Sequence, residues 1–247
     1  MRLPLLIDPH FDPADRSPEE LAKIFEDASV DGAALTPLNR PPSPELIRSL
    51  QADEDKEFII FAGVKLETEK GTLLFFPEQL ERFFGSDWTP PQERWTFAEV
   101  LERCARWPGA LVATHPYDHN ERQGIGDRVY TCDSLTAVET RIGRGLPVRD
   151  HMADRAAEAC GLARLGASGG SENLAGRAMT VFPESVEHQS DFVAALREGL
   201  CWPIEVEDPR FPRRRFQLED DSPEQEHRPR RRPAHRPARG GGRGQRR

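Results

Sequence analysis

The sequence predicts an α/β domain with a largely parallel sheet, and two observations carry that prediction. Compact apolar runs alternate, along the first hundred residues, with segments whose apolar residues recur at helical spacing. The connections between them are short and contain Pro, Gly, Ser or Asp, as they do in βα units. A chain of 247 residues is long enough for one large domain or two small ones. Alternation of strand and helix is typical of sheets whose strands run mostly parallel.

The first predicted strand, residues 3–7, leads into a helix with a clear start signal. Ser17 can act as the N-cap, Pro18 takes the first helical position and Glu20 the third, which together form a capping box. The helix is expected to end before Asp31-Gly32, because Gly favours the end of a helix.

Further strands and helices follow at similar spacing. A hairpin is expected to turn at residues 69–71, where Glu-Lys-Gly separates two apolar runs. Beyond residue 203 the regular pattern ends. The other predicted strands are 33–36, 57–64, 73–76, 109–114, 135–141 and 162–168, and the other predicted helices are 44–54, 97–107, 151–161 and 190–199.

The C-terminal end has a different composition. Residues 228–247 contain nine Arg, no Asp or Glu, and no aliphatic residue larger than Ala, so they cannot bury enough apolar surface to offset chain entropy. We therefore expect one domain over residues 1–205 and a disordered tail over 206–247. The net charge of the chain is −8, and without those nine arginines residues 1–227 carry about −17. A body so acidic disfavours broad contact with a phosphate backbone.

The Arg-rich tail is the expected contact if the chain binds nucleic acid or an acidic protein. A solvated end that has no partner is an equally good interpretation. Contact between Arg and phosphate is supported by the composition, whereas stacking on bases is not, because the tail has no aromatic residues. The arginines concerned are Arg228, Arg230, Arg231, Arg232, Arg236 and Arg239.

Cysteine usage and the lengths of the apolar runs predict a cytoplasmic protein. Cys104, Cys132, Cys160 and Cys201 are separated by roughly 30 or 40 residues and form no CxxC motif, so we expect reduced thiols. The apolar run before Asp8 is too short for a signal sequence, and no run approaches the ~18 residues of a membrane span. The expectation is a protein that makes no membrane contact.

Side chains able to bind a metal follow two of the predicted strands. Asp8, His10 and Asp12 alternate after the first strand, and His115 follows the strand over 109–114. In α/β folds the carboxyl ends of strands carry the chemistry. These four residues could hold one divalent ion, Zn or Mn. Alternatively, they form a hydrogen-bonded polar cluster that holds no metal.

The order of the motifs resembles the PHP (polymerase and histidinol phosphatase) superfamily over about residues 3–200. Members of that superfamily have a distorted seven-stranded barrel and two or three metal ions that hydrolyse phosphoesters. The resemblance therefore implies a PHP-type distorted (βα)7 barrel. The matching motifs are SPEEL at 17–21, GTLL at 71–74, THPY at 114–117, GR at 176–177 and TVFP at 180–183.

The metal-binding positions of the superfamily are only partly retained. Asp8 and His10 match D-x-H-x-H, with Asp12 at the second His, and His115 matches the His of A-H-P. Lys65 stands where the superfamily has a bridging Glu. The other substitutions are Pro37 and Leu38 in the T-D-H-N motif, Thr72 for the His of G-H-L-L, and Ser168 and Gly170 for the Asp and His of G-S-D-A-H.

These substitutions predict a degenerate metal site. A closely spaced metal pair needs bridging carboxylates and at least three suitable protein ligands. The ammonium of Lys65 would repel a cation by several kcal/mol at an effective dielectric constant of ~20, and it could pair with Asp8 or Asp12 instead. We therefore expect no cofactor and a catalytically inactive PHP-like protein that serves as a binding or regulatory module. The alternative is a residual phosphoesterase that uses a single metal ion.

Three further features concern residues in or near the predicted site. Glu139 ends a strand where PHP proteins often have an acidic residue, although a carboxylate that faces water or pairs with Arg is the simpler expectation. Gly169-Gly170 could cradle a phosphate, but the segment lacks the P-loop Lys and the Rossmann spacing, so the glycines are expected to fill the space of the absent Asp and His. His119 and His151 are expected at the surface.

Overall fold

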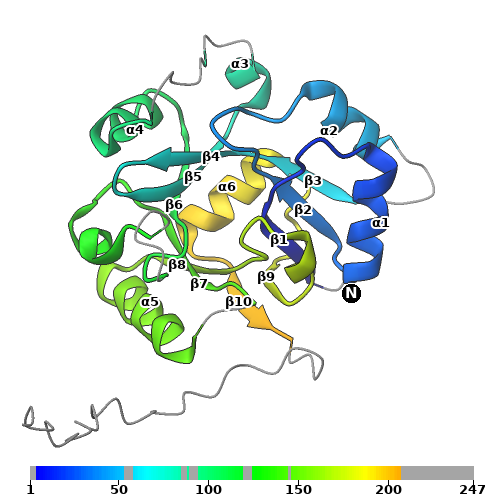
Figure 1. Ribbon diagram of the computed structural model, residues 1–247. Coiled ribbons are helices and arrows are strands. Elements are labelled where there is room, and N and C mark those ends of the chain that lie inside the picture. Colours follow the sequence, from blue (N-terminus) through cyan, green and yellow to red (C-terminus); the bar gives the residue numbers. More distant parts are fainter. Residues whose placement is uncertain are drawn as a thin grey trace, which may run out of the picture. The chain divides into compact units, whose positions relative to one another are not determined.

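The computed structural model describes residues 4–52, 58–84, 88, 94–118, 124–143 and 146–206. Two five-stranded sheets lie side by side, with helices on the outside and helix α6 (Gln189–Glu198) between them (Figure 1). The predicted Arg-rich tail lies outside the described residues apart from Val206, and so does His119. Among the described residues no helix is both long and apolar enough to cross a membrane.

The first sheet combines a parallel core with two antiparallel strands. Its order is β10-β9-β1-β2-β3. The strands β1, β2 and β3 are parallel, β9 runs antiparallel to β1, and β10 runs antiparallel to β9. The bounds are β1 Leu5–Phe11, β2 Gly32–Leu35, β3 Ile59–Ala62, β9 Ala178–Phe182 and β10 Trp202–Glu205.

The second sheet begins with the predicted hairpin. Its order is β4-β5-β6-β7-β8, in which β4, β5 and β6 are antiparallel neighbours and β6, β7 and β8 are parallel. Only Gly63 separates β3 from β4, so the chain passes directly from one sheet into the other. The bounds are β4 Val64–Thr68, β5 Gly71–Pro77, β6 Gly109–Ala113, β7 Ala137–Arg141 and β8 Ala163–Gly166.

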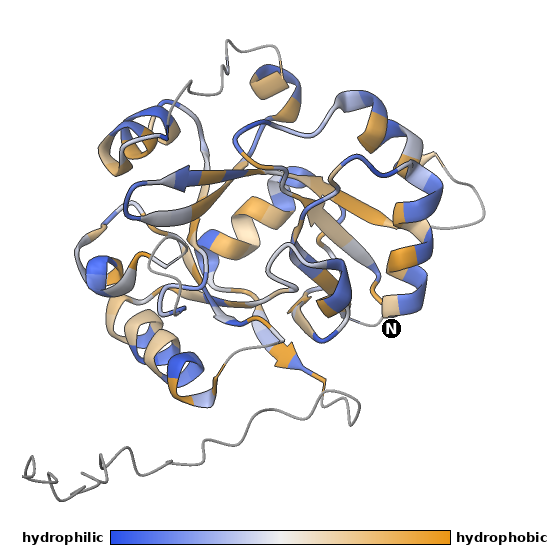
Figure 2. Cartoon of the chain, viewed as in Figure 1, coloured by the Kyte–Doolittle hydropathy of each residue, from blue (hydrophilic) through white to orange (hydrophobic). Residues whose placement is uncertain are grey.

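The helices begin where the sequence places caps. The capping box of Ser17 and Glu20 opens α1, the Ser43 hydroxyl accepts from the Leu46 backbone N–H at the start of α2, and Thr96 with Glu99 caps α4. Their outer faces are hydrophilic and their inner faces apolar (Figure 2). The remaining bounds are α1 Pro18–Ala28, α2 Pro44–Gln51, α3 Leu80–Phe84, α4 Phe97–Cys104 and α5 Pro147–Cys160, with 3₁₀ turns η1 Gly126–Thr131 and η2 Glu172–Leu174.

Helix α6 joins the two sheets through one aromatic side chain. Phe192 is fully buried and stacks on Phe61 of β3 with 4.4 Å between ring centroids. Its ring also contacts Phe76 of β5 and Phe182 of β9, each with 5.1 Å between centroids. Because these strands belong to both sheets, burial of this ring holds the sheets together at one end.

The structure differs from the sequence predictions in its strands more than in its helices. The sheets are mixed rather than largely parallel, and the predicted strand over 57–64 is divided at Gly63. Strands β9 and β10 were not predicted. Pro203 within β10 is tolerated because β10 is an edge strand, which needs hydrogen bonds on one side only.

We predict that Phe192→Ala lowers the free energy of unfolding by about 3–5 kcal/mol, because it leaves a large cavity between the sheets. Urea denaturation followed by circular dichroism measures the change. Leu200→Ala, at a side chain that is 51% exposed, is the control and should change stability by less than about 0.5 kcal/mol. Equal losses for the two variants would contradict this account of the core.

Candidate functional site

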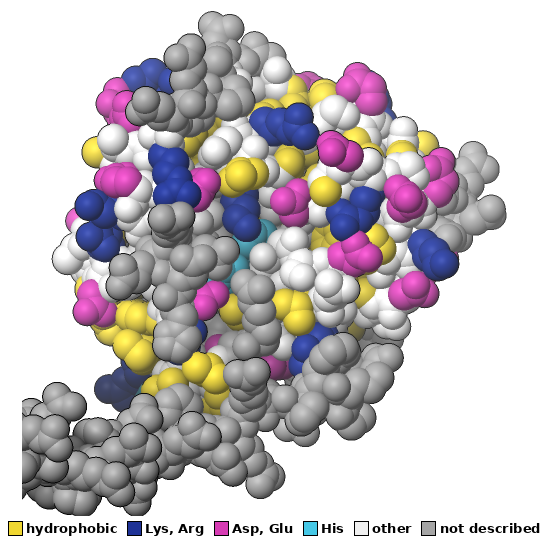
Figure 3. All heavy atoms as spheres, viewed as in Figure 1, with side chains coloured by type: hydrophobic (Ala, Val, Ile, Leu, Met, Phe, Trp, Pro, Cys, Tyr) yellow, Lys and Arg dark blue, Asp and Glu magenta, His cyan; other side chains and the backbone are white. Residues whose placement is uncertain are grey.

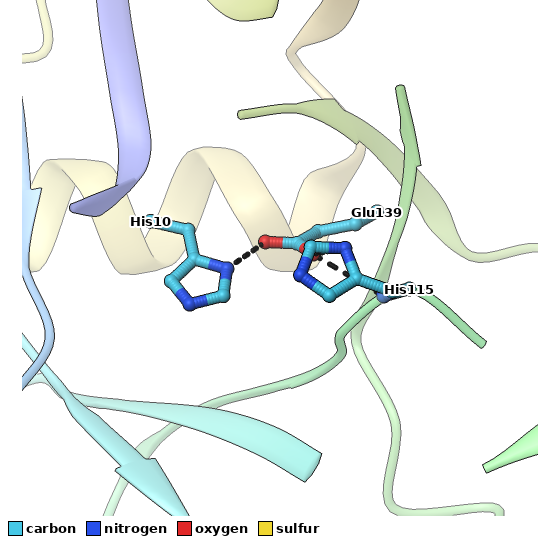
Figure 4. A group of neighbouring side chains, drawn as sticks. All are labelled: His10, His115 and Glu139. Carbon is cyan, nitrogen blue, oxygen red and sulfur yellow. Dashed lines mark hydrogen bonds and ion pairs between the residues drawn. The ribbon is translucent and has the colours of Figure 1, made fainter. Parts of the chain in front are cut away.

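Three ionisable side chains from both sheets meet at the centre of the molecule. His10 lies on β1, His115 follows β6, and Glu139 lies on β7 (Figure 4). Their candidate ligand atoms lie within 4.8 Å of one another, and all three residues are buried. Two of them come from neighbouring parallel strands that end at the same edge of the second sheet, and His10 reaches them from the first sheet.

The carboxylate of Glu139 contacts both imidazole rings. His10 Nδ1 donates to Oε1 at 2.6 Å, and the His115 backbone N–H donates to Oε2 at 3.2 Å. His115 Nδ1 lies 2.9 Å from Oε2, close enough for an ion pair although not aligned for a hydrogen bond. The expectation that Glu139 faces water or pairs with Arg is therefore wrong, since a buried carboxylate in this strand finds its partners in the two histidines.

The protonation states follow from this geometry. Burial by itself would raise the pKa of Glu139, but the charges and hydrogen bonds of His10 and His115 outweigh it and hold that pKa below its ordinary value. Burial lowers the pKa of His10 to about 4, against the opposing effect of Glu139 and with smaller contributions from Lys65 and His115 in the same direction as burial. At neutral pH Glu139 is therefore ionised and His10 is neutral, with its proton on Nδ1.

This tautomer leaves His10 Nε2 as a hydrogen-bond acceptor. The atom is buried and has no hydrogen-bond partner among the described residues. Figure 4 shows it on the side of the ring that points away from Glu139. A carboxylate that holds Nδ1–H and frees Nε2 is the usual outer-shell arrangement of a metal-binding histidine, and the same arrangement orients a histidine that binds other ligands.

Two glycines form the wall behind the rings. Gly169 and Gly170 have φ angles of +68° and +78°. A Cβ at residue 169 would lie 2.8 Å from His115 Cε1, and a Cβ at residue 170 would lie 3.2 Å from His10 Nε2 and 3.5 Å from Lys65 Nζ. The imidazoles therefore pack directly against this backbone, and a side chain at either position would meet them.

Asp8 and Ser168 connect β1 to the loop after β8. Asp8 Oδ1 accepts from the backbone N–H groups of His10 and Ser168, each at 3.1 Å, and the Ser168 hydroxyl donates to the His10 carbonyl at 2.9 Å. Asp8 Oδ2 is buried and has no hydrogen-bond partner among the described residues. Burial raises the pKa of Asp8 to about 7, although hydrogen bonds from Ser168 and His10 oppose the shift.

The other predicted site residues lie around this centre or apart from it. Asp12 Oδ1 accepts from the Ala14 backbone N–H at 3.0 Å, so its carboxylate shapes the turn before α1. Leu38 pairs with Lys65 in a parallel bridge, flanked by Pro37. Leu38 is 46% exposed and Lys65 is half-buried. A histidine side chain is visible in a hollow near the middle of the face in Figure 3, with a basic side chain beside it.

The remaining predictions about single residues can be placed as well. His151 is exposed on α5, as predicted. The four cysteines are free thiols, with Cys160 exposed and the other three buried. Sequence reasoning placed Glu139 at the pocket but missed its bonds to the histidines. The signal was an acidic residue directly after the apolar pair Ala137-Val138 in a short strand, because a carboxylate buried there needs partners.

Comparison with known proteins finds similarity at the level of structure. No protein family and no curated protein matches the sequence. PsfC from Pseudomonas syringae PB-5123 superposes with a TM-score of 0.60 at 16% identity, over 83% of this chain and 93% of PsfC.

Two further structures carry names of one class. A two-domain protein from Bacteroides vulgatus, described as containing a predicted PHP-like metal-dependent phosphoesterase, has a TM-score of 0.60 at 12% identity, over 82% of this chain and 65% of that one. A protein from Bifidobacterium adolescentis described as a metal-dependent phosphoesterase has a TM-score of 0.53 at 12% identity, over 77% and 94%. The chain therefore shares the fold of these structures, in agreement with the fold that the resemblance of its motifs implies.

We predict that Asp8 makes the protein less stable as the pH rises. Its folded-state pKa of about 7 lies above the ordinary value of 3.8, so the stability that its protonated form contributes is complete below pH 3.8 and is lost as the pH rises through 7. In Asp8→Asn this loss should be absent. The free energy of unfolding of the variant minus that of the wild type should therefore increase by roughly 2–3 kcal/mol from pH 5 to pH 8.

Denaturant unfolding of both proteins with chelator present measures this difference. Asp15→Asn, at a fully exposed carboxylate, is the control and should leave the pH dependence unchanged. A difference between Asp8→Asn and wild type that stays constant from pH 5 to pH 8 would contradict the proposed ionisation of Asp8.

Proposed function

We propose that this chain is a PHP-fold protein without a working polynuclear metal centre, which acts as a binding or regulatory module. The observation that carries the proposal is the place of Lys65. Its Nζ and His10 Nε2 both lie within 3.5 Å of the position that a Cβ on residue 170 would take. A metal ion bound through His10 Nε2 would therefore lie beside an ammonium group, which opposes it by several kcal/mol at an effective dielectric constant of ~20.

The nearby carboxylates do not offset that repulsion. Both oxygens of Glu139 face the two histidines and Asp8 Oδ1 faces two backbone N–H groups. Of these four oxygens, Asp8 Oδ2 alone has no partner among the described residues. The Ser168 hydroxyl donates to the His10 carbonyl. Pro37, Leu38 and Gly170 have no side-chain nitrogen or oxygen. The residues present therefore do not fit a centre of two or three ions, which needs bridging carboxylates.

The finer description of the fold belongs to the same proposal. We infer that the two sheets are the halves of a PHP-type distorted (βα)7 barrel. Two observations support this. Strand β3 continues into β4 through Gly63, which joins the sheets on one side. On the other side β8 and β9 lie close together, since a Cβ on Gly166 of β8 would lie 2.4 Å from the Met179 carbonyl of β9. The described strands do not close into a continuous hydrogen-bonded barrel.

We predict that the purified protein contains fewer than two tightly bound transition-metal ions per chain, because its site lacks the carboxylates that neutralise a metal pair. Elemental analysis by mass spectrometry measures the content of Zn, Mn and Fe. Lys65→Glu removes the ammonium and adds a carboxylate beside His10, so it should tighten Zn binding about tenfold or more.

Lys70→Glu is the matched control, since it makes the same charge change at an exposed position of the same hairpin. Its affinity for Zn should equal that of the wild type. Two or more ions per wild-type chain would overturn the proposal, and so would identical Zn affinities for Lys65→Glu and wild type.

A second candidate function, a phosphoesterase with a single metal ion, is favoured by one specific observation. His10, His115 and Glu139 place three nitrogen or oxygen donors within 4.8 Å of one another, and His10 Nε2 is buried with no hydrogen-bond partner among the described residues. These three residues could hold one Zn or Mn ion, which would supply Lewis-acid chemistry to a phosphoester. The sequence analysis predicts Asp8 and Asp12 in this set as well. Asp8 Oδ1 accepts from two backbone N–H groups, and Asp12 is engaged in its own turn.

This second function predicts that Mn or Zn gives measurable hydrolysis of p-nitrophenyl phosphate, and that His10→Ala reduces the rate by at least about a hundredfold because a metal ligand is lost. The assay follows release of nitrophenolate by full-length protein with and without added metal. His151→Ala, at an exposed histidine, is the control and should keep the rate. Equal background rates for wild type and His10→Ala would exclude this function.

A further inference from the structure

We propose that Lys65, His10 and Leu38 together bind a hydroxy monocarboxylic acid that carries an apolar chain. This inference rests on the proposed function, because it requires a site without a polynuclear metal centre. In it the carboxylate contacts Lys65 Nζ, the hydroxyl donates to His10 Nε2, and the chain lies against Leu38.

The ammonium of Lys65 supplies the positive charge for the carboxylate. Nζ carries three donors, so it can hold a ligand oxygen in addition to its contacts within the protein. Lys65 is half-buried, and its Nζ lies 3.5 Å from the position that a Cβ on Gly170 would take. Charge-assisted hydrogen bonds between ammonium and carboxylate are stronger than neutral ones, and partial burial strengthens them further.

The hydrogen-bond acceptor Nε2 of His10 is the reason for proposing a ligand with a hydroxyl group. Nε2 is fully buried and has no hydrogen-bond partner among the described residues, which costs free energy unless a ligand donates to it. Glu139 holds the proton on Nδ1, so Nε2 can only accept. Nε2 and Nζ lie 3.2 Å and 3.5 Å from the position that a Cβ on residue 170 would take, so both groups border the space above Gly170.

The exposed side chain of Leu38 is the reason for proposing a ligand with an apolar chain. Asn39 N–H donates to the Lys65 carbonyl at 2.6 Å and Lys65 N–H donates to the Pro37 carbonyl at 3.1 Å, which places Leu38 opposite Lys65 in a parallel bridge. Bridge partners direct their side chains to the same side of a sheet. Leu38 is 46% exposed, so an apolar surface stands next to the ammonium.

The charges at the site favour one negative charge on the ligand. The Glu139 carboxylate lies directly behind His10, with Oε1 2.6 Å from Nδ1, and it would repel a second negative charge on the ligand. A carboxylate has one negative charge, whereas a phosphate monoester has nearly two at neutral pH. The site therefore fits a monocarboxylate better than a phosphate.

The test measures binding of four compounds to chelator-treated, full-length protein by isothermal titration calorimetry. The compounds are 2-hydroxyoctanoate, octanoate, glycolate and inorganic phosphate. We expect 2-hydroxyoctanoate to bind about tenfold more tightly than octanoate, which lacks the hydroxyl, or glycolate, which lacks the chain. In ¹⁵N spectra of histidine-labelled protein, 2-hydroxyoctanoate should shift the His10 Nε2 resonance, and octanoate should leave it in place.

Two variants assign the contacts. Lys65→Met keeps the length and apolar stem of the side chain and should weaken binding about tenfold or more, whereas the matched control Lys70→Met should bind as the wild type does. Leu38→Ser, at an exposed position that tolerates change, should abolish the preference for 2-hydroxyoctanoate over glycolate and keep the affinity for glycolate.

Several outcomes would overturn the inference. Two of them are equal affinities of Lys65→Met and wild type for 2-hydroxyoctanoate, and equal affinities of the wild type for 2-hydroxyoctanoate and glycolate. The others are tighter binding of phosphate than of 2-hydroxyoctanoate, and no binding of any of the four compounds by a protein that carries no metal. The failure of the proposed function has a different signature, which is two or more metal ions per chain before chelation. The two failures can therefore be distinguished on one protein preparation.

Discussion

The buried carboxylate of Glu139 is the constraint on which the arrangement of the site depends. Full burial makes an ionised carboxylate costly unless positive or donating groups surround it, and here His10 and His115 do so from two different strands. The contact with His10 ties the first sheet to the second, and the contact with the backbone of His115 fixes the loop after β6. One side chain thus contacts both histidines and sets the proton location of His10.

Because of this interaction, the presence of the two histidines is not by itself evidence for metal binding. In a metalloprotein, a histidine is kept because it binds the ion, but His10 and His115 also keep Glu139 from being a buried charge without partners. Their rings stack with centroids 5.4 Å apart and pack directly against Gly169 and Gly170. Loss of either ring would therefore disturb packing and charge balance even in a protein that never binds a metal, so their presence alone does not identify a metalloenzyme.

Sequence reasoning succeeded where the determinants are local and failed where they are distant. The capping box at Ser17 and the hairpin turn at residues 69–71 depend on neighbouring residues, and the structure confirms both. The pairing of His10 with Glu139 joins residues 129 positions apart, which no local pattern encodes. Strand β10 was missed because Pro203 argues against a strand, except at an edge, and edges are known only once the sheet is assembled.

The proposed role of Lys65 follows from an electrostatic requirement that metals and ammonium groups can both meet. The buried carboxylates of Asp8 and Glu139 favour a positive charge near them, and a divalent ion or a lysine can supply it. The two differ in what they then permit. A metal ion polarises a phosphoryl oxygen and activates water, whereas an ammonium donates hydrogen bonds and holds an anion without activating it. Lys65 Nζ lies beside His10 Nε2, where an ammonium group can attract an anion, and this is why we propose binding as the function.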